Sequence, residues 1–339
     1  MTRDCTILIP THNRHHYLKR CLQWFLEFGY PIVIADSSAR QWESELRRHP
    51  SITYIWHPGG FDCYLPKLKM ALDTIATPYM AMCADDDFIL HEGIRKAVAF
   101  LEDNPDYSFA QGYSYLYQVF GARAALWPLY YPSRGAFQDD WMERVAARND
   151  TIYYGVNRTA HLKKAVEFLV RQDFSGIVDS AVGFFDFALT STVARQGKLK
   201  RLPVPFGLRE YSPLVSAVGT RYRTIVTDKV ARFYDNLIDF LSEGDRSEAT
   251  RTALQRVCAR DYAGQLSYDE SISGALSRKR RLAFLPPAAL PLAEELFRYW
   301  SALRLFLTSD FFPALGVFAH PEYPRFRALV TKALDPVEP

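Results

Sequence analysis

One stretch of the sequence restricts the possible folds more than any other, an unbroken apolar run that ends in three acids. Residues 79–84 are apolar or aromatic throughout, a pattern typical of a strand that is buried on both faces. Asp85, Asp86 and Asp87 follow directly. Ligands of open α/β sheets bind beyond the carboxyl ends of the strands, so the pattern predicts a ligand site at these acids.

A divalent cation is the expected partner of the acids at 85–87. Adjacent carboxylates raise one another's pKa unless a cation neutralises their charge. Mg²⁺ and Mn²⁺ prefer carboxylate oxygens, and one or two carboxylates often hold them together with substrate phosphates. The alternative is a solvated acidic loop that caps the helix beginning near Gly93.

Composition limits the class of protein. The 339 residues are 48% hydrophobic and 23% charged, as in a globular protein with one large and one smaller domain. A net charge of +3 gives no global signature of nucleic-acid binding. The five scattered cysteines form no CxxC pattern, which favours reduced thiols in a cytoplasmic protein. No signal peptide is recognised, and no apolar run approaches the roughly 18 residues that span a bilayer.

The first ninety residues alternate between strands and helices, which predicts an α/β fold with a parallel sheet. The expected strands are 5–10, 32–35, 52–56 and 79–84, and the expected helices are about 15–28 and 65–75. Polar residues follow three of the strands, at 11–14, 36–38 and 85–87. We expect these three stretches to share one edge of the sheet.

Three stretches, residues 7–14, 34–38 and 77–88, together resemble the N-terminal half of a family 2 type glycosyltransferase with the GT-A fold. Members of this family open with a strand that is followed by a Pro-Thr or Pro-x-Asn-Arg turn. This turn and an aspartate after the second strand together bind the nucleoside. A DxD stretch then binds metal and diphosphate. The resemblance covers about residues 1–215. It implies a nucleotide-sugar donor and a mainly parallel central sheet.

The resemblance assigns roles to residues at the strand ends. It implies a nucleotide pocket lined by Pro10, Thr11, Asn13, Arg14, Asp36, Ser37, Asp85 and Asp86, with Asp36 accepting hydrogen bonds from the base. It implies that Asp85 and Asp87 serve ribose and metal, the metal being Mn²⁺ or Mg²⁺. Because three acids follow one another, it is ambiguous by one residue which two of them correspond to the DxD pair.

Two basic side chains are expected near the diphosphate. Lys67 and Lys69 cannot share one helical face, so at most one of them is expected to reach the phosphates, and Lys67 is favoured. Both lysines being solvated is the alternative. In the related fold a basic residue of a late loop closes over the diphosphate, and Arg209 matches it, since a guanidinium gives bidentate phosphate contacts. A surface salt bridge to Glu210 is the alternative.

The first candidates for the catalytic base are two aspartates of a later helix. An inverting transferase needs a carboxylate that takes the proton from the acceptor hydroxyl. The helix expected at about 179–195 carries Asp179 and Asp186 on nearly the same side. In family 2 enzymes the base lies at the start of a helix that is followed by a glycine and a strand. By this resemblance Asp186, in a helix followed by Gly197, is the predicted base. Asp179, which can also be a helix cap, is the alternative, and Asp139 with Asp140 comes third.

The sequence predicts two domains, a GT-A-like domain at 1–220 and a helical region at 221–339. Its helices are expected at about 225–241, 246–262, 290–306 and 324–334. Such a region positions an acceptor or forms a homo-oligomer interface. Residues 278–287 are a basic cluster followed by an apolar loop, which predicts peripheral contact with anionic lipid at ~1 kcal/mol per basic side chain. A solvated charge run is the alternative.

The predicted function is a metal-dependent, inverting glycosyltransferase that acts on a glycan, lipid-linked or other hydroxyl acceptor. One rival is a nucleotidyltransferase on a similar sheet. That class usually has a glycine-rich loop after its first strand, and residues 10–14 contain no glycine. The other rival is a non-catalytic binding module that retains the fold. The intact acids at 85–87 and Asp186 argue against it.

Overall fold

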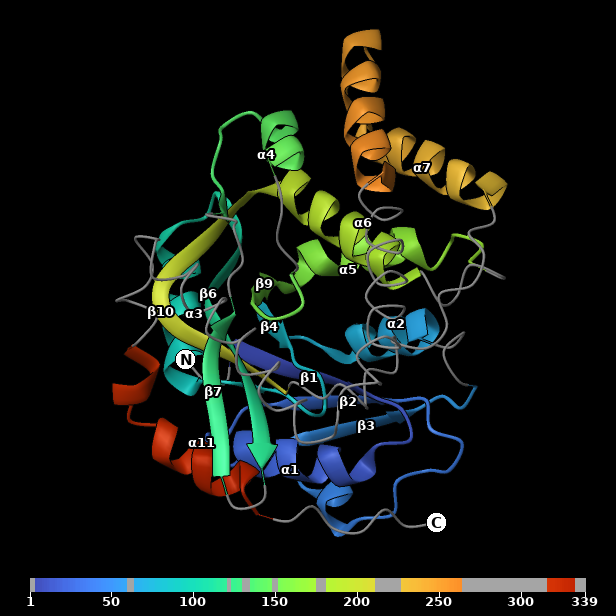
Figure 1. Ribbon diagram of the computed structural model, residues 1–339. Helices are drawn as coiled ribbons and strands as arrows, with labels where there is room; N and C mark the ends of the chain where they lie inside the picture. The colour runs from blue at the N-terminus through green and yellow to red at the C-terminus, as the bar shows by residue number, and fades with distance from the viewer. Residues whose placement is uncertain are drawn as a thin grey trace, which may run out of the picture.

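The computed structural model describes residues 4–59, 64–120, 123–129, 135–147, 152–174, 181–210, 227–263 and 316–332. A central sheet lies between two layers of helices (Figure 1). Its α/β class agrees with the sequence prediction.

The strands are β1 (Cys5–Thr11), β2 (Ile32–Asp36), β3 (Ile52–Trp56), β4 (Tyr79–Met82), β5 (Phe88–Ile89), β6 (Tyr107–Phe120), β7 (Arg123–Leu129), β8 (Gly135–Ala136), β9 (Val156–Arg158) and β10 (Lys198–Glu210). The α-helices are α1 (His15–Leu26), α2 (Tyr64–Thr74), α3 (His91–Asp103), α4 (Trp141–Ala147), α5 (Thr159–Leu169), α6 (Ala181–Gln196), α7 (Thr227–Leu241) and α11 (Tyr323–Val330). Two short 3-10 helices are η2 (Glu45–Arg48) and η4 (Gly316–Ala319). Residues 248–263 are also helical.

The sheet is parallel where the sequence predicts it and mixed elsewhere. Its strand order is β3-β2-β1-β4-β9-β6-β10-β5, with β7 beside β6 and β8 beside β10. β1 runs parallel to β2 and β4, and β2 runs parallel to β3. β9 is antiparallel to both of its neighbours, while β6 and β10 pair in parallel. The antiparallel strands add to the predicted parallel half without disturbing it.

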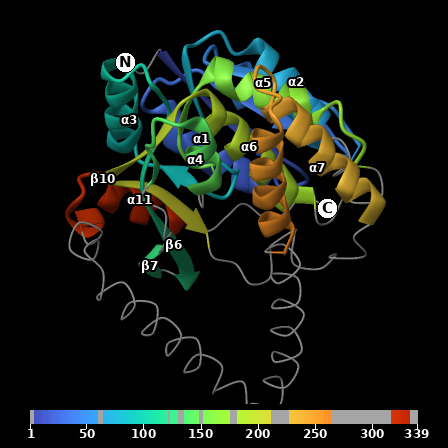
Figure 2. The ribbon, with the colours of Figure 1, turned by 90° about the horizontal axis from the view of Figure 1, so that it is seen from above.

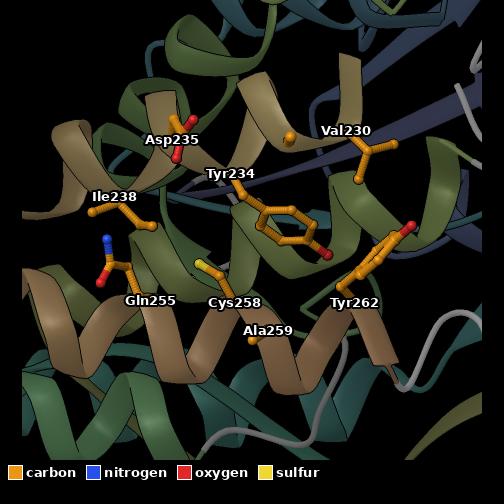
Figure 3. Close-up of a pocket in the computed structure, with 9 residues that line it drawn as sticks. Val230, Tyr234, Asp235, Ile238, Gln255, Cys258, Ala259 and Tyr262 are labelled. Atoms are coloured by element: carbon orange, nitrogen blue, oxygen red, sulfur yellow. The ribbon is translucent and has the colours of Figure 1, made fainter. Parts of the chain in front are cut away.

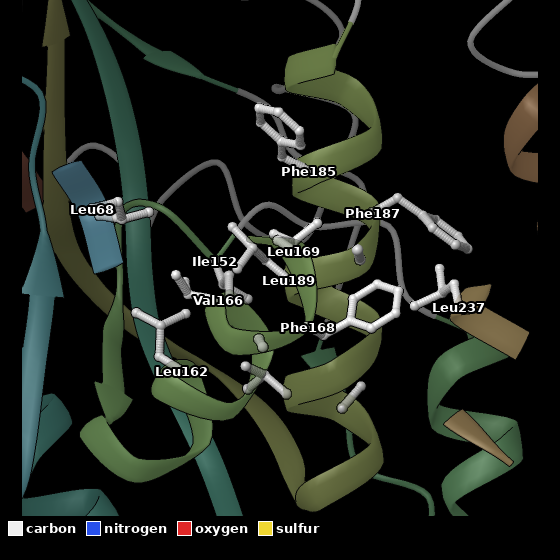
Figure 4. Packing of buried hydrophobic residues seen from close by; sticks show 14 of the residues in the cluster. Leu68, Ile152, Leu162, Val166, Phe168, Leu169, Phe185, Phe187, Leu189 and Leu237 are labelled. Carbon is white, nitrogen blue, oxygen red and sulfur yellow. The ribbon is translucent and has the colours of Figure 1, made fainter. Parts of the chain in front are cut away.

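β1 is buried on both faces, as its apolar run predicts. Ile7 and Ile9 pack in the cluster that includes Leu22 of α1. Leu8, between them, packs in the opposite cluster with Leu68 of α2. Successive side chains of a strand point to opposite faces, so β1 joins the two apolar cores. Figure 4 shows part of the second core, where α5 and α6 pack together.

Two expected strands are one strand in the structure. The sequence suggests strands at 107–111 and 113–120, but β6 runs unbroken through Gly112. A Cβ atom at Gly112 would lie 2.3 Å from the carbonyl oxygen of Val204. The absence of a side chain therefore lets β10 approach β6 closely. The sequence also suggests an extended segment at 202–206. In the structure this segment is the middle of β10, which is longer at both ends.

The C-terminal helices pack on different sides of the molecule. α7 contacts the α5–α6 layer, where Phe168 stacks on Phe240 at 4.6 Å between ring centroids. α11 instead contacts α1, and Figure 2 shows α11 and α7 on opposite sides. The domain boundary near 220, the helix at 290–306 and the lipid-contact segment 278–287 lie outside the described residues, and they stay predictions. In the ranges that the structure describes, no helix is long and apolar enough to cross a membrane.

A cavity of about 390 Å³ lies between α7 and the helical residues 248–263 (Figure 3). Its walls come from these two segments alone. Tyr234 and Tyr262 meet edge to face across it with ring centroids 6.2 Å apart. The Tyr234 hydroxyl donates a 2.8 Å hydrogen bond to Asp261. The cavity is thus formed without the residues at the strand ends.

Candidate active site

The carboxyl ends of β1, β2 and β4 meet at one edge of the sheet. Thr11 lies opposite Asp36 in the register of β1 and β2. Leu8 lies opposite Met82, the last residue of β4. The acidic turn, which we define as residues 84–87, therefore begins beside β1. The polar strand ends that the sequence predicts to share one edge are neighbours.

The turn that follows β1 holds two of the acids. Asp85 Oδ2 accepts a 2.6 Å hydrogen bond from Thr11 Oγ1, and Asp85 Oδ1 lies 3.2 Å from Arg14 Nη2. The same Arg14 nitrogen contacts Asp86 Oδ2. Thr11 and Arg14, which the resemblance places in the nucleotide pocket, thus both lie against the acidic turn. Arg14 neutralises part of its charge.

Asn13 ties the β1 turn to the residues after β2. Its φ of 53° is in the left-handed region, which asparagine tolerates better than most residues. Its N–H donates a 2.7 Å hydrogen bond to Ser38 Oγ, and its Oδ1 accepts one of 3.0 Å from the Ala39 N–H. Asn13 therefore has a structural role beside its predicted one. Pro10 precedes it as a partly exposed residue of β1.

Asp36 is fully buried among hydrogen-bond donors. Its Oδ1 accepts a 2.7 Å bond from the Ser38 N–H, and its Oδ2 accepts one of 2.6 Å from the Tyr54 hydroxyl. His15 Nε2 lies 2.9 Å from the same Oδ2. Burial opposes ionisation, but these hydrogen bonds outweigh it and lower the pKa of Asp36. Its contact with a nucleobase stays a prediction.

Lys67 is buried beneath the strand ends. Its Nζ donates hydrogen bonds of 2.6 Å to the Thr11 carbonyl and 2.8 Å to Ser37 Oγ. It also lies over the ring of Tyr64, 5.6 Å from the centroid. Lys67 thus joins the ends of β1 and β2, and its charge opposes the rise that burial causes in the pKa of Asp85.

Asp87 lies on the other side of the acidic turn, with partners from β10 and the loop before β9. Its Oδ1 accepts a 2.7 Å hydrogen bond from the Glu210 N–H. Its carboxylate is also hydrogen-bonded to Tyr154, and its Oδ2 lies 3.8 Å from Arg209 Nε. The guanidinium of Arg209 lies over the Tyr154 ring at 4.3 Å. The structure thus places Arg209 beside the acids.

Burial raises the pKa values of two of the acids in spite of the nearby cations. Burial raises the pKa of Asp85 to about 7, although Arg14 opposes the shift. Burial and the adjacent Asp86 raise the pKa of Asp87 to about 8. A further cation would favour the ionised form of both groups.

Two buried carboxylates suit a hard divalent cation that completes its shell with phosphate oxygens and water. Over the described parts of the chain, no three His, Cys, Asp or Glu side chains form a metal-binding group.

Asp186 lies on α6, where this helix meets the N-terminal turn of α2. Burial raises the pKa of Tyr64 to about 12 and also raises the pKa of Tyr153. The negative charge of Asp186 adds to both shifts. Phe185 stacks on Tyr64 with ring centroids 6.2 Å apart. Figure 4 shows Phe185 and Phe187 projecting from different sides of α6, and Asp186 lies between them in the sequence.

Of the three other candidate bases, the structure describes Asp139 and Asp140. Asp179 lies outside the described residues. Asp139 is 95% exposed and forms an ion pair of 2.7 Å with Lys198. Asp140 accepts hydrogen bonds from backbone N–H groups at the start of α4. Asp139 and Asp140 therefore have structural partners at the surface.

Sequence reasoning missed the tyrosine pair that connects these groups. Tyr154 is hydrogen-bonded to Asp87, and its neighbour Tyr153 interacts with Tyr64 and Asp186. The pair thus spans from the acidic turn to α6. The only signal in the sequence is two aromatic residues before a glycine and a short strand.

Residues 6–153 match the sequence model of "Glycosyl transferase family 2". This part of the chain, a little under half of it, is therefore similar in sequence to glycosyltransferase family 2. The family resemblance predicted from the strand-end motifs is therefore confirmed. No curated protein sequence matches the chain.

Solved structures of TarS from S. aureus have a similar fold to this chain. TarS 1-349 in complex with UDP matches with a TM-score of 0.52 and 13% identity, over 97% of this chain and 88% of that one. The UDP-GlcNAc complex matches with a TM-score of 0.50 and 15% identity, over 97% and 89%. A longer TarS structure is matched over only 42% of its length. These similarities show the fold and not the substrate.

Proposed function

We propose that this chain transfers a glycosyl group from a nucleotide sugar to a hydroxyl group of a glycan or lipid-linked acceptor. One observation carries the proposal. Thr11 and Arg14, from the turn after β1, converge on Asp85 and Asp86 after β4. In a family 2 region, this is where a nucleoside diphosphate would be bound, at the carboxyl edge of a parallel sheet.

The first donor class to test is a uridine diphosphate sugar. TarS, whose solved complexes contain UDP and UDP-GlcNAc, shares the fold over nearly the whole chain. Asp36 is an ionised acceptor beside the β1 turn, as recognition of a base N–H requires. To reach a base, its carboxylate would exchange one of its present donors, His15 or Tyr54.

Asp85 and Asp87 would hold Mn²⁺ or Mg²⁺ together with the diphosphate oxygens. The support is that both are buried carboxylates with raised pKa values. When bound, such an ion stabilises the negative charge that develops on the leaving diphosphate.

Basic residues of the chain would bind the same diphosphate. Arg209 is 31% exposed, so its guanidinium can turn from Asp87 toward phosphate oxygens in a bidentate contact. Arg14 adds charge from the opposite side of the acidic turn. Lys67 donates hydrogen bonds to the Thr11 carbonyl and to Ser37. To contact a phosphate directly, its ammonium group would have to break these hydrogen bonds.

Asp186 is proposed as the base, with Asp179 as the alternative. The base takes the proton from the acceptor hydroxyl as that oxygen attacks the anomeric carbon. The attack on the face opposite the diphosphate inverts the configuration. The support is that Asp186 is partly buried and that its charge acts on Tyr153 and Tyr64, so a carboxylate lies near the pair of tyrosines that leads to the acidic turn.

Thermal unfolding with UDP, GDP, dTDP, CDP and CMP, each with and without Mn²⁺, tests the proposal. A ligand at 100 times its dissociation constant stabilises the fold by about 2.7 kcal/mol. We expect one nucleoside diphosphate to raise the melting temperature only with metal. Asp85→Asn should abolish the increase. Asp73→Asn, at an exposed carboxylate paired with Lys69, should retain it. No increase with any nucleotide at millimolar concentration would refute the proposed donor site.

A further inference from the structure

The C-terminal helix α11 contacts residues that carry the acidic turn. Phe326 is fully buried. Its ring meets Phe88 edge to face at 5.6 Å between centroids and meets Tyr117 in the same way at 5.0 Å. Phe88 directly follows Asp87 in the sequence. An aromatic residue from the far end of the chain thus packs one residue away from a predicted metal ligand.

Tyr117 supports the acidic turn from the sheet side. Its hydroxyl oxygen lies 2.6 Å from the Asp86 carbonyl and 2.9 Å from Glu210 Oε2, and its proton is donated to one of them at a time. Arg20 Nη2 donates a 3.0 Å hydrogen bond to the same hydroxyl and pairs with Glu210. Glu210 in turn donates its N–H to Asp87. The ring that Phe326 contacts is therefore the centre of this network.

α11 is fastened to the N-terminal half of the chain by two residues that precede Phe326. The Glu322 carboxylate accepts hydrogen bonds of 2.8 and 2.9 Å from the N–H groups of His91 and Glu92, at the start of α3. The Arg325 guanidinium lies over the Trp24 ring at 4.8 Å and forms an ion pair with Glu27 of the α1 end. These contacts fix where the Phe326 ring enters the core.

We propose that Phe326 is a positioning residue for the acidic turn. By filling the space against Phe88 and Tyr117, it holds the Asp86 carbonyl and the Asp87 carboxylate in place for a nucleoside diphosphate. Interiors are close-packed, so removal of a buried ring leaves a cavity into which its neighbours relax. The inference uses the proposed function only for its nucleotide readout, since the order of the turn can be measured without a ligand.

Amide hydrogen exchange in the full chain tests the effect on the turn. The Asp87 N–H donates to the Ala84 carbonyl, and the Glu210 N–H donates to Asp87. In Phe326→Ala both amides should exchange about tenfold faster or more, which is the change expected when local opening becomes easier. The Ile7 amide, bonded to the Pro31 carbonyl, is the internal reference and should change little.

Matched variants separate positioning from general loss of stability. Val330→Ala removes a buried side chain of the same helix and should leave exchange at the turn unchanged. Phe326→Leu retains most of the volume and should restore slow exchange. Tyr117→Phe keeps the ring but removes the hydroxyl, so it should accelerate the same two amides. If Phe326→Ala does not fold, the exchange rates of Tyr117→Phe show whether the contacts of Tyr117 order the acidic turn.

Calorimetric titration of the folded variants with UDP and Mn²⁺ gives the functional readout. Phe326→Ala should bind about tenfold more weakly than wild type, whereas Val330→Ala should bind equally well. Unchanged exchange at Asp87 and Glu210 in Phe326→Ala, or equal acceleration in Val330→Ala, overturns the inference. If wild type binds no nucleoside diphosphate, the proposed function fails, and the exchange data still decide the role of Phe326.

Discussion

Lys67 and Lys69 lie two residues apart on α2, and only Lys67 is buried under the strand ends. Lys67 donates to the Thr11 carbonyl and to Ser37, and thereby joins two neighbouring strands. Lys69 is 31% exposed and pairs with Asp73 one helical turn further on. Helical residues two apart face different sides, so one helix supplies one internal cation and one surface cation.

Lys67→Met should destabilise the protein much more than Lys69→Met. The first change leaves the buried Thr11 carbonyl and Ser37 hydroxyl without this donor, which costs about 1–3 kcal/mol. The second removes an exposed ion pair, which is worth about 0–1 kcal/mol. Urea unfolding of the two variants measures both. Equal losses would contradict the structural role of Lys67.

Asp87→Asn should stabilise the fold at high pH. The folded protein keeps the Asp87 proton up to a pKa of about 8, whereas an unfolded aspartate releases it near pH ~3.9. Stability therefore falls as pH rises between these values. The amide of asparagine does not titrate, and its oxygen still accepts the Glu210 N–H. We expect a gain of about 1 kcal/mol or more at pH 9 and little gain at pH 4.5.

Melting temperatures from pH 4.5 to pH 9 check this expectation. The difference between Asp87→Asn and wild type should widen as pH rises. Asp73→Asn, at a carboxylate that is 54% exposed, provides the control, and its difference from wild type should stay nearly constant. A difference for Asp87→Asn that is the same at both ends of the range would show that Asp87 is ionised throughout.

Tyr154→Phe should raise the pKa of Asp87 further. The Tyr154 hydroxyl is hydrogen-bonded to the ionised Asp87 carboxylate and lowers its pKa. Removing a donor to the charged form of an acid raises its pKa, by the same reasoning. Carbon-13 NMR titration of the Asp87 carboxyl measures the shift, and Tyr262→Phe, in the helical residues 248–263, is the control. An unchanged titration midpoint would contradict the role given to Tyr154.

Asp186→Asn should lower the turnover number about 10²–10⁴-fold, which is the usual contribution of a general base. Nucleotide affinity should change little, because the base acts on the acceptor. The measurement is nucleoside diphosphate release from the donor sugar, with nucleotide binding measured in parallel. If Asp179→Asn gives this loss and Asp186→Asn does not, Asp179 is the base.

Much of the strand-end site was predictable because parallel strands end at a common edge. Apolar runs identify β1, β2 and β4, and the polar residues after each run identify Thr11, Asp36 and Asp85 without any tertiary information. The donors that enclose Asp36 were not predictable. Tyr54 comes from β3 and His15 from α1, and their convergence depends on how the layers pack.

The remaining errors come from side chains that meet across the fold. A sequence shows that Tyr154 is aromatic, but not that its loop passes beside Asp87. It shows that α11 is amphipathic, but not that Phe326 enters the core beside α1. The family pattern also ends near residue 215, before this segment begins. Periodicity identifies elements, whereas their partners are fixed by packing.

The contact between α11 and α1 affects when this protein can finish folding. Arg325 reaches the Trp24 carbonyl across 301 residues of sequence. Ribosomes add about 5–20 residues per second, so Phe326 emerges roughly 15–60 s after the first helix. Until then the rings of Phe88 and Tyr117 lack their cover, and the nascent chain exposes apolar surface. A segment that is synthesised late therefore completes the packing beside β5 and β6, whose residues are synthesised much earlier.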